Sequence, residues 1–236
     1  MMPTALVQTS SALSPAPLVQ IGVVLAWLGL VGGVAEGLRR VMTLDSEITR
    51  KIVHIGAGHV ILLAWWLQTP TWMGVAASVG AGMLALLSYR YPLLPGINGV
   101  GRRSLGTFFY AVSIGVLTAC FWPTWQPQYA ALGILVMTWG DGLAALVGQN
   151  WGRHPYEILG NQKSWEGSLA MALASFMVSL LVLGFSAGFT AQVWAMAGVV
   201  AIAATLLETL SFYGLDNLTV PLGSAALAYG LVEWWG

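Results

Sequence analysis

The chain has 236 residues, of which 57% are hydrophobic and only 8% are charged, whereas roughly a quarter of residues are charged in an average soluble domain. Such a composition excludes a water-compatible surface over the whole chain and predicts an integral membrane protein. The formal net charge is zero, which argues against a nucleic-acid partner, because duplex binding depends mainly on phosphate neutralisation by Lys and Arg.

The predicted elements are a short tail and a bundle of helices. Residues 1–17 are rich in Ser, Thr, Ala and Pro and lack Lys and Arg, so we expect a disordered tail rather than a signal or transit peptide. Residues 18–236 predict a single all-α transmembrane domain. Its apolar runs, separated by polar residues, Pro or Gly, predict eight spans over residues 18–38, 52–68, 71–91, 104–122, 129–149, 164–185, 190–212 and 217–235.

Two of these predicted spans have features that are unusual for a transmembrane helix. The second run is short and the last contains Pro221, so seven spans is the alternative. The single cysteine, Cys120, lies in an apolar run, which excludes a disulfide or a cysteine-based metal site within one chain.

The basic residues give an independent check on the spans. All nine fall on one side of the predicted bundle, and they are Arg39, Arg40, Arg50, Lys51, Arg90, Arg102, Arg103, Arg153 and Lys163. The opposite connections, 68–71, 123–128 and 186–190, contain no Lys or Arg. By the positive-inside rule the charged connections face the cytoplasm and both termini face away.

The densest polar stretch runs from the end of the fifth span to the start of the sixth. Asp141 lies inside an otherwise apolar helix, and an ionisable residue at that depth usually faces a cavity, an ion or a partner. The alternative is a structural salt bridge to an Arg. Glycines after Asp141 allow the backbone to approach a ligand, and Lys163 and Ser164 stand at the predicted start of the sixth helix, where amides and the helix dipole favour an anion.

Three further polar clusters lie on the same side. Arg50, Lys51 and His54 open the second span, and His59, deeper in that span, is expected to pack or hydrogen-bond. The other clusters are Arg102, Arg103, Ser104, Gly106 and Thr107, and Glu208, Asp216, Asn217 and Thr219. One basic helix end alone is typical of a lipid-headgroup anchor. Four converging connections instead predict a site with cations for phosphates and carboxylates for a metal.

Five stretches stand in a distinctive order: Arg50-Lys-Ile-Val-His54-Ile-Gly56, Ser104-Leu-Gly106-Thr107, Gly140-Asp141-Gly142-Leu-Ala-Ala-Leu-Val-Gly148, Asn161-Gln-Lys163-Ser164-Trp-Glu166-Gly167-Ser168 and Gly214-Leu-Asp216-Asn217-Leu-Thr-Val-Pro221. Together they resemble the phytol, farnesol and dolichol kinase family, which is similar in part to CTP-dependent diacylglycerol kinases and phosphatidate cytidylyltransferases. The resemblance covers roughly residues 36–230 and is greatest to the phytol kinase branch.

The resemblance implies a reaction and its participants. A nucleoside triphosphate, CTP or UTP, would donate its γ-phosphate to the hydroxyl of an isoprenoid alcohol such as phytol, geranylgeraniol or farnesol, with Mg²⁺ or Mn²⁺. It also implies a bacterial-type inner membrane, plasma or thylakoid, with the active face cytoplasmic.

Residue roles follow from phosphoryl transfer, which needs mainly positioning and charge neutralisation. The expected catalytic residues are Asp141, Lys163 and His54, with His54 as a base, although Asp141 could also take the alcohol proton. The expected metal ligands are Asp141, Glu166, Asp216 and Asn217. The expected nucleotide-binding residues are Arg50, Lys51, Gly148, Gly152, Arg153, Asn161, Lys163, Ser164 and Gly167.

Two other functions fit some of these features. A diacylglycerol kinase or a CDP-lipid synthase would also need carboxylates for a metal and cations for the phosphates. A small ion-coupled transporter would use Asp141 as its ion ligand, but transporters usually show internal repeats and midplane sites, and this chain shows no repeat.

Overall fold

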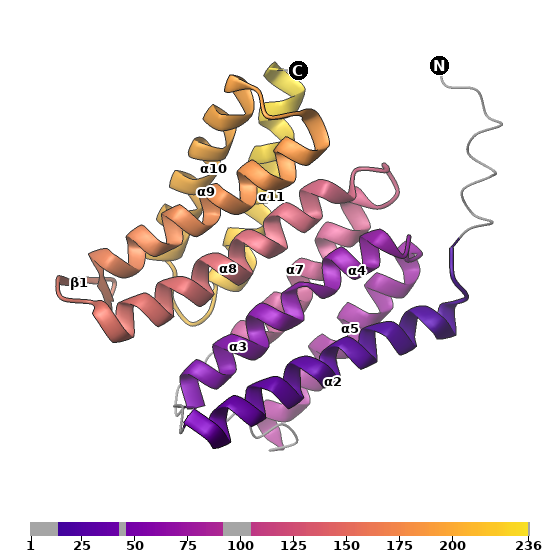
Figure 1. Ribbon diagram of the computed structural model, residues 1–236, viewed down its shortest axis with the longest axis horizontal. Coiled ribbons are helices and arrows are strands. Elements are labelled where there is room, and N and C mark those ends of the chain that lie inside the picture. Colours follow the sequence, from indigo (N-terminus) through magenta and orange to yellow (C-terminus); the bar gives the residue numbers. More distant parts are fainter. Residues whose placement is uncertain (1–13, 43–45, 92–104, 236) are drawn as a thin grey trace.

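A computed structural model describes residues 14–42, 46–91 and 105–235 as a helical bundle with one small hairpin (Figure 1). The helices are α2 Pro17–Met42, α3 Ser46–Gly58, α4 Val60–Trp66, α5 Thr71–Arg90, α7 Gly106–Phe121, α8 Pro127–Trp151, α9 Trp165–Ala187, α10 Ala191–Thr209 and α11 Asp216–Trp235. The strands are β1 Pro155–Ile158 and β2 Asn161–Ser164, between α8 and α9. The predicted all-α membrane-type bundle is confirmed.

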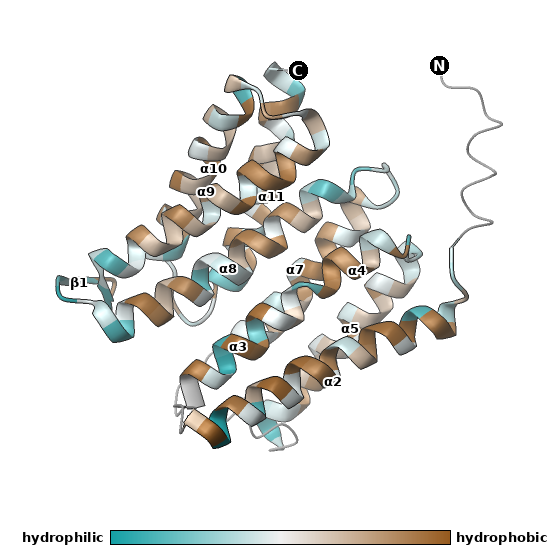
Figure 2. Cartoon of the chain, in the orientation of Figure 1, coloured by the Kyte–Doolittle hydropathy of each residue, from teal (hydrophilic) through white to brown (hydrophobic). Residues whose placement is uncertain are grey.

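The apolar surface of the bundle matches a membrane environment. In the part of the chain that the structure describes, five helices are long and apolar enough to cross a bilayer: α2, α5, α8, α9 and α10. Helix α7 is apolar but shorter, and α11 contains Pro221, so the predicted number of spans stays a prediction. Figure 2 shows mainly hydrophobic residues along the helices and hydrophilic residues around β1 and the neighbouring ends of α8 and α9.

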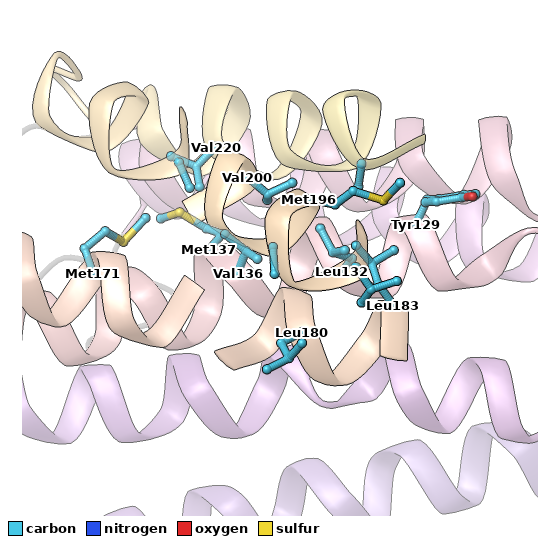
Figure 3. Close-up of a cluster of buried hydrophobic side chains, with 14 residues drawn as sticks. Tyr129, Leu132, Val136, Met137, Met171, Leu180, Leu183, Met196, Val200 and Val220 are labelled. Carbon is cyan, nitrogen blue, oxygen red and sulfur yellow. The ribbon is translucent and has the colours of Figure 1, made fainter. Parts of the chain in front are cut away.

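Helix α8 forms the centre of the bundle. Leu132 and Met137 on α8 are fully buried, and they pack with side chains from α9, α10 and α11 (Figure 3). Ile134, also fully buried on α8, packs with side chains from α4, α7 and α11. Burial of a large apolar side chain from water contributes roughly 1.5–3 kcal/mol. In a bilayer, close packing rather than removal from water supplies the stabilisation. This central helix carries Asp141 to the middle of the polar residues.

The predicted second span is two helices that meet at His59. The Nδ1 atom of His59 lies 2.7 Å from the Ile55 carbonyl oxygen, and the His59 ring contacts the rings of Trp27 and Trp139. The predicted packing and hydrogen-bonding role of His59 is therefore confirmed. Beside it, a Cβ on Gly58 would come within 2.3 Å of Thr138 Oγ1, so only glycine lets α3 approach α8 this closely.

The polar segment between α8 and α9 is an antiparallel hairpin, which the sequence reasoning did not predict. Tyr156 pairs with Lys163, and the turn residues Leu159 and Gly160 have φ values of 50° and 77°, as in a type I′ turn. Lys163 therefore lies in β2, and α9 begins at Trp165 rather than at the predicted residue 164. The two-residue turn reverses the chain and directs β2 back toward the bundle.

Candidate active site

Lys51 and Asp141 form a buried ion pair between α3 and α8. Lys51 Nζ lies 2.5 Å from Asp141 Oδ2, and the two side chains are only 8% and 16% exposed. The alternative prediction of a salt bridge at Asp141 was therefore correct in kind, but the partner is a lysine instead of an arginine. Burying both charges is costly, and removing one partner leaves an uncompensated charge.

His54 stands on the same side of α3 as Lys51, one turn further along. Its Nε2 is 3.9 Å from Asp141 Oδ2, which is beyond hydrogen-bond distance. Within the described residues this buried nitrogen has no hydrogen-bond partner. The imidazole lies against the ring of Tyr110 from α7, at 4.8 Å between centroids, so three helices meet around Asp141.

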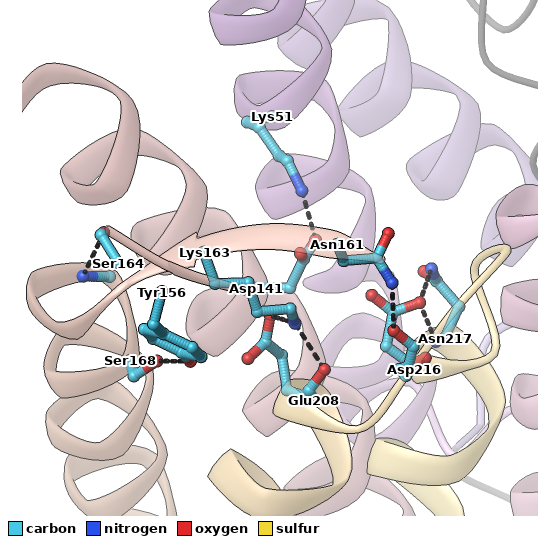
Figure 4. A network of polar contacts seen from close by, with 12 residues as sticks. Lys51, Asp141, Tyr156, Asn161, Lys163, Ser164, Ser168, Glu208, Asp216 and Asn217 are labelled. Atoms are coloured by element: carbon cyan, nitrogen blue, oxygen red, sulfur yellow. Dashed lines mark hydrogen bonds and ion pairs between the residues drawn. The ribbon is translucent and has the colours of Figure 1, made fainter. Parts of the chain in front are cut away.

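A second buried ion pair joins the hairpin to α10. Lys163 Nζ donates to Glu208 Oε1 at 2.5 Å and to the Glu208 carbonyl oxygen at 2.6 Å (Figure 4). Since an ammonium has three N–H donors, one remains for another acceptor. The sequence analysis named Glu208 but missed this pairing. A usable signal existed, because a carboxylate in the last turn of an apolar helix opposes the helix dipole and calls for a cation.

Asp216 begins α11 and faces the same region. Its Oδ1 accepts from the backbone N–H of Asn217 at 3.0 Å and from Asn217 Nδ2 at 3.1 Å. Asp216 also interacts electrostatically with Asp141, Lys51 and Glu208. Among the described residues no Lys or Arg lies at ion-pair distance from Asp216. Three carboxylates thus share two lysines, which leaves Asp216 without a lysine partner among the described residues.

Asn161 anchors the hairpin a second time. Its Nδ2 donates to the Ser211 carbonyl oxygen at 3.2 Å, and Asn161 lies two residues before Lys163 on the same face of β2. The hairpin is therefore held against the end of α10 and the α10–α11 connection at two points. Figure 4 shows side chains from α3, α8, β2, α10 and α11 coming together: Lys51, Asp141, Asn161, Lys163, Glu208, Asp216 and Asn217.

Ser164 and three predicted nucleotide-binding glycines pack together at the junction of α8 and α9. Ser164 Oγ caps α9 by accepting from Gly167 N at 3.1 Å. A Cβ on Gly148, Gly152 or Gly167 would meet Ser164 within 3.1 Å. These residues therefore let two helices approach each other, and the N–H of Gly167 is already satisfied. The geometry gives them a packing role and does not support the predicted approach to a phosphate.

Glu166, one of the four predicted metal ligands, contacts His154 and none of the other three. Its carboxylate accepts from His154 Nδ1 at 2.6 Å and from His154 N at 3.3 Å, which ties the start of β1 to the first turn of α9. A metal role for Glu166 has no support from this geometry. The structure describes no group of three or more His, Cys, Asp or Glu side chains placed to hold a metal ion within residues 14–42, 46–91 and 105–235.

The remaining basic residues are exposed or lie outside the described ranges. Arg50 is exposed on α3, and Arg153 is exposed in the link between α8 and β1. The predicted residues Arg102, Arg103 and Ser104 fall outside the residues that the structure describes. The chemistry available at the cluster is a set of ammonium groups for phosphate oxygens, carboxylates for a cation, and one unpaired imidazole nitrogen.

Comparison with known proteins agrees with the motifs. No family model and no solved structure matches the chain. A phytol kinase from Synechocystis sp. is 54% identical over 219 residues, covering 92% of this chain and 94% of that protein. A probable chloroplastic phytol kinase 2 from Oryza sativa is 35% identical over 208 residues, covering 80% and 67%. A chloroplastic farnesol kinase from Arabidopsis thaliana is 30% identical over 211 residues, covering 78% and 66%. With this identity extending over most of its length, the chain belongs to the phytol kinase family.

Proposed function

We propose that the chain transfers the γ-phosphate of CTP or UTP to the hydroxyl of an isoprenoid alcohol such as phytol, geranylgeraniol or farnesol. Family membership makes it a kinase with an alcohol acceptor, and a kinase uses a nucleotide phosphate donor. None of the relatives named above is a transporter or a cytidylyltransferase, so neither alternative gains support.

The observation that carries the proposal is the convergence of Lys51, Asp141, Lys163 and Asp216 at one end of a membrane bundle. Transfer of a phosphoryl group spreads negative charge over its oxygens, and fixed cations stabilise that charge. Lys163 suits this role because Glu208 holds its ammonium by two contacts and leaves one donor. Arg50 and Arg153, which are both exposed, would meet the outer phosphates.

The cofactor of the proposed reaction is Mg²⁺ or Mn²⁺. Asp141 and Asp216, with the Asn217 amide, fit such an ion because they supply oxygen ligands from α8 and α11, and because the cluster has one carboxylate more than it has lysines. When bound, the ion would neutralise charge on the nucleotide phosphates. Glu166 is left out of this set because His154 occupies its carboxylate.

His54 is the proposed base for the alcohol. Its Nε2 is buried, faces Asp141 and has no hydrogen-bond partner within the described residues, so its lone pair or proton is available to a substrate hydroxyl. Asp141, already held by Lys51, would orient the imidazole and stabilise it once it gains the proton.

The position in a membrane suits the acceptor. Exposed apolar side chains such as Leu25, Leu84 and Phe185 cover the outside of the bundle and contact lipid in the proposed setting. An isoprenoid chain would dissolve in the same lipid layer, while its hydroxyl stays near the polar end of the bundle. We place that end on the cytoplasmic side of a plasma or thylakoid membrane, where nucleotide is present.

The test uses purified protein in lipid nanodiscs. It would be incubated with CTP, UTP or ATP and a panel of phytol, geranylgeraniol, farnesol, undecaprenol and diacylglycerol, and the products identified by mass. We expect an isoprenyl monophosphate and a nucleoside diphosphate. Release of pyrophosphate with a CMP-lipid would instead identify a cytidylyltransferase, and phosphorylation of diacylglycerol alone would move the acceptor to another class.

A further inference from the structure

A small cavity lies where the hairpin turn meets the α10–α11 connection. Its volume is about 340 Å³, and it is lined by Leu159, Gly160, Asn161, Phe212 and Tyr213. Small-molecule sites usually occupy roughly 300–1,000 Å³. This cavity is therefore large enough for a ring system such as a nucleotide base.

Two tight turns form its walls. Ile158 to Asn161 is the turn of the hairpin, and Phe212 to Leu215 is a second turn closed by a 3.0 Å hydrogen bond from Leu215 N to the Phe212 carbonyl oxygen. Tyr213 has φ 52°, a conformation that is unfavourable for a bulky residue and is found preferentially where the surroundings fix it, including ligand clamps. The walls are thus held in place before any ligand arrives.

The chemistry of the walls is aromatic and amide. The rings of Phe212 and Tyr213 are nearly perpendicular, with centroids 5.9 Å apart, and both side chains are exposed at 45% and 74%. A flat ligand can therefore lie against a ring face. Asn161 uses one N–H for the Ser211 carbonyl oxygen, which leaves its second N–H and its amide oxygen to face a ligand.

The cavity lies next along the chain to the residues proposed to bind phosphate. Asn161 and Lys163 lie on the same face of β2, about 6.6 Å apart at the rise of a strand. On the other wall, Asp216 comes directly after the turn that carries Phe212 and Tyr213. A ligand with a flat ring at one end and phosphates at the other would span from the cavity to the Lys163 ammonium.

We propose that this cavity binds the base of the nucleotide donor. The base stacks on Phe212 and Tyr213, and its hydrogen-bonding edge faces the Asn161 amide. This inference rests on the proposed function, since it takes the phosphates of the donor to lie at Lys163. It adds the residues that read the base.

A membrane-interface role is the competing explanation for the aromatic residues. Aromatic side chains gather at the level of lipid headgroups, and Phe212 and Tyr213 would do so as anchors. That explanation accounts for their exposure. It does not account for the preformed cavity or for the amide that faces it, and it predicts no effect on nucleotide binding.

Equilibrium binding of labelled CTP to the protein in nanodiscs tests the inference without requiring turnover. Stacking on an aromatic side chain typically contributes about 5- to 150-fold in affinity. We therefore expect Phe212→Ala and Tyr213→Ala each to weaken CTP binding at least 5-fold. Displacement of CTP by tripolyphosphate, which has no base, should keep its inhibition constant in these variants. Phe185→Ala, at the other end of α9, is the matched control and should leave CTP binding unchanged.

Asn161→Asp gives a second, independent measurement. A carboxylate accepts but cannot donate, so this variant should change the ratio of CTP to UTP affinity. Unchanged CTP affinity in both alanine variants would overturn the inference, and so would an equal loss of tripolyphosphate binding. If wild-type protein bound CTP in this way but phosphorylated no alcohol, the proposed function would fail while the base site stood.

Discussion

Removing Lys51 should destabilise the protein strongly, and neutralising Asp141 as well should restore it. The two charges meet at 2.5 Å with side chains 8% and 16% exposed, so little solvent can replace a lost partner. Breaking a buried pair by removing one member costs about 3–5 kcal/mol, because the remaining charge is left uncompensated. Lys51→Met should therefore lower the free energy of unfolding by about that amount.

Asp141→Asn should cost less than Lys51→Met. The asparagine oxygen can still accept a hydrogen bond from the Lys51 ammonium, so the lysine keeps a partner although it loses the charge attraction. In the double variant Lys51→Met/Asp141→Asn no buried charge is left, and most of the lost stability should return. All variants that lack the Asp141 carboxylate should remain inactive, because the amide cannot hold a cation as a carboxylate does.

Reversible unfolding in mixed detergent micelles measures the stability, and phosphorylation of phytol in nanodiscs measures the activity. The combination separates a structural from a catalytic role of Asp141. Normal turnover by the stable double variant would show that the ion pair serves packing alone. A loss of less than about 1 kcal/mol in Lys51→Met would show that the pair is not buried from water as the structure has it.

Three further outcomes are expected. Lys163→Ala should raise the KM for nucleotide and lower kcat about 10²- to 10³-fold, which is the effect of removing one preorganised donor. Lys163→Arg should not restore activity, because the wider planar guanidinium does not fit the two Glu208 oxygens. Equal steady-state constants in the wild type and both variants would contradict the assignment of Lys163 to phosphate binding. His54→Gln should lower kcat about 10²- to 10⁴-fold with an unchanged KM for nucleotide, and a normal kcat would transfer the base role to Asp141. In a Cys120→Ala background, Thr124→Cys should react with a membrane-impermeant maleimide only from outside, whereas Gln162→Cys, at another exposed position, should react only from the cytoplasm. The reverse labelling pattern would invert the proposed orientation.

The sequence was sufficient for the helices and for the side on which the polar residues gather. Long apolar runs and the alternation of basic connections depend on local composition, so both can be recognised in short stretches of the sequence. Asp141 stood out for the same reason, as a single acid in an apolar helix. The lysine that pairs with it lies 90 positions earlier, so the pairing follows from how α3 crosses α8, which no local pattern contains.

The hairpin was missed because its turn carries a weak signal. A type I′ turn is most readily predicted from Asn-Gly or Asp-Gly, whereas here Leu159 occupies the first central position at φ 50°. The strands have only four residues each, with polar and apolar side chains mixed, so no alternation identified them. The consequence was local: Lys163 was assigned to a helix end, although its side chain does reach the predicted site.

The glycines show how one composition fits two explanations. A run of small residues near a lysine is compatible with a phosphate loop and equally with close helix packing. Only the surroundings of Gly148, Gly152 and Gly167 distinguish them, since each faces Ser164 across the α8–α9 junction. The close packing of these glycines is observed, and their binding of a phosphate stays a prediction.

The pairing of carboxylates with lysines also explains how a membrane protein can keep a proposed phosphate-binding site stable before the ligand binds. Two unpaired ammonium groups at Lys51 and Lys163 would be expensive to bury, and Asp141 and Glu208 remove that cost by direct contact. Under the proposed function, a nucleotide brings negative charge to the lysines and a cation to the carboxylates, so the charges of both buried ion pairs keep a partner in both states. Binding then exchanges partners instead of burying new charge, and this is why nearly equal numbers of acidic and basic side chains, rather than a purely basic pocket, suit the site.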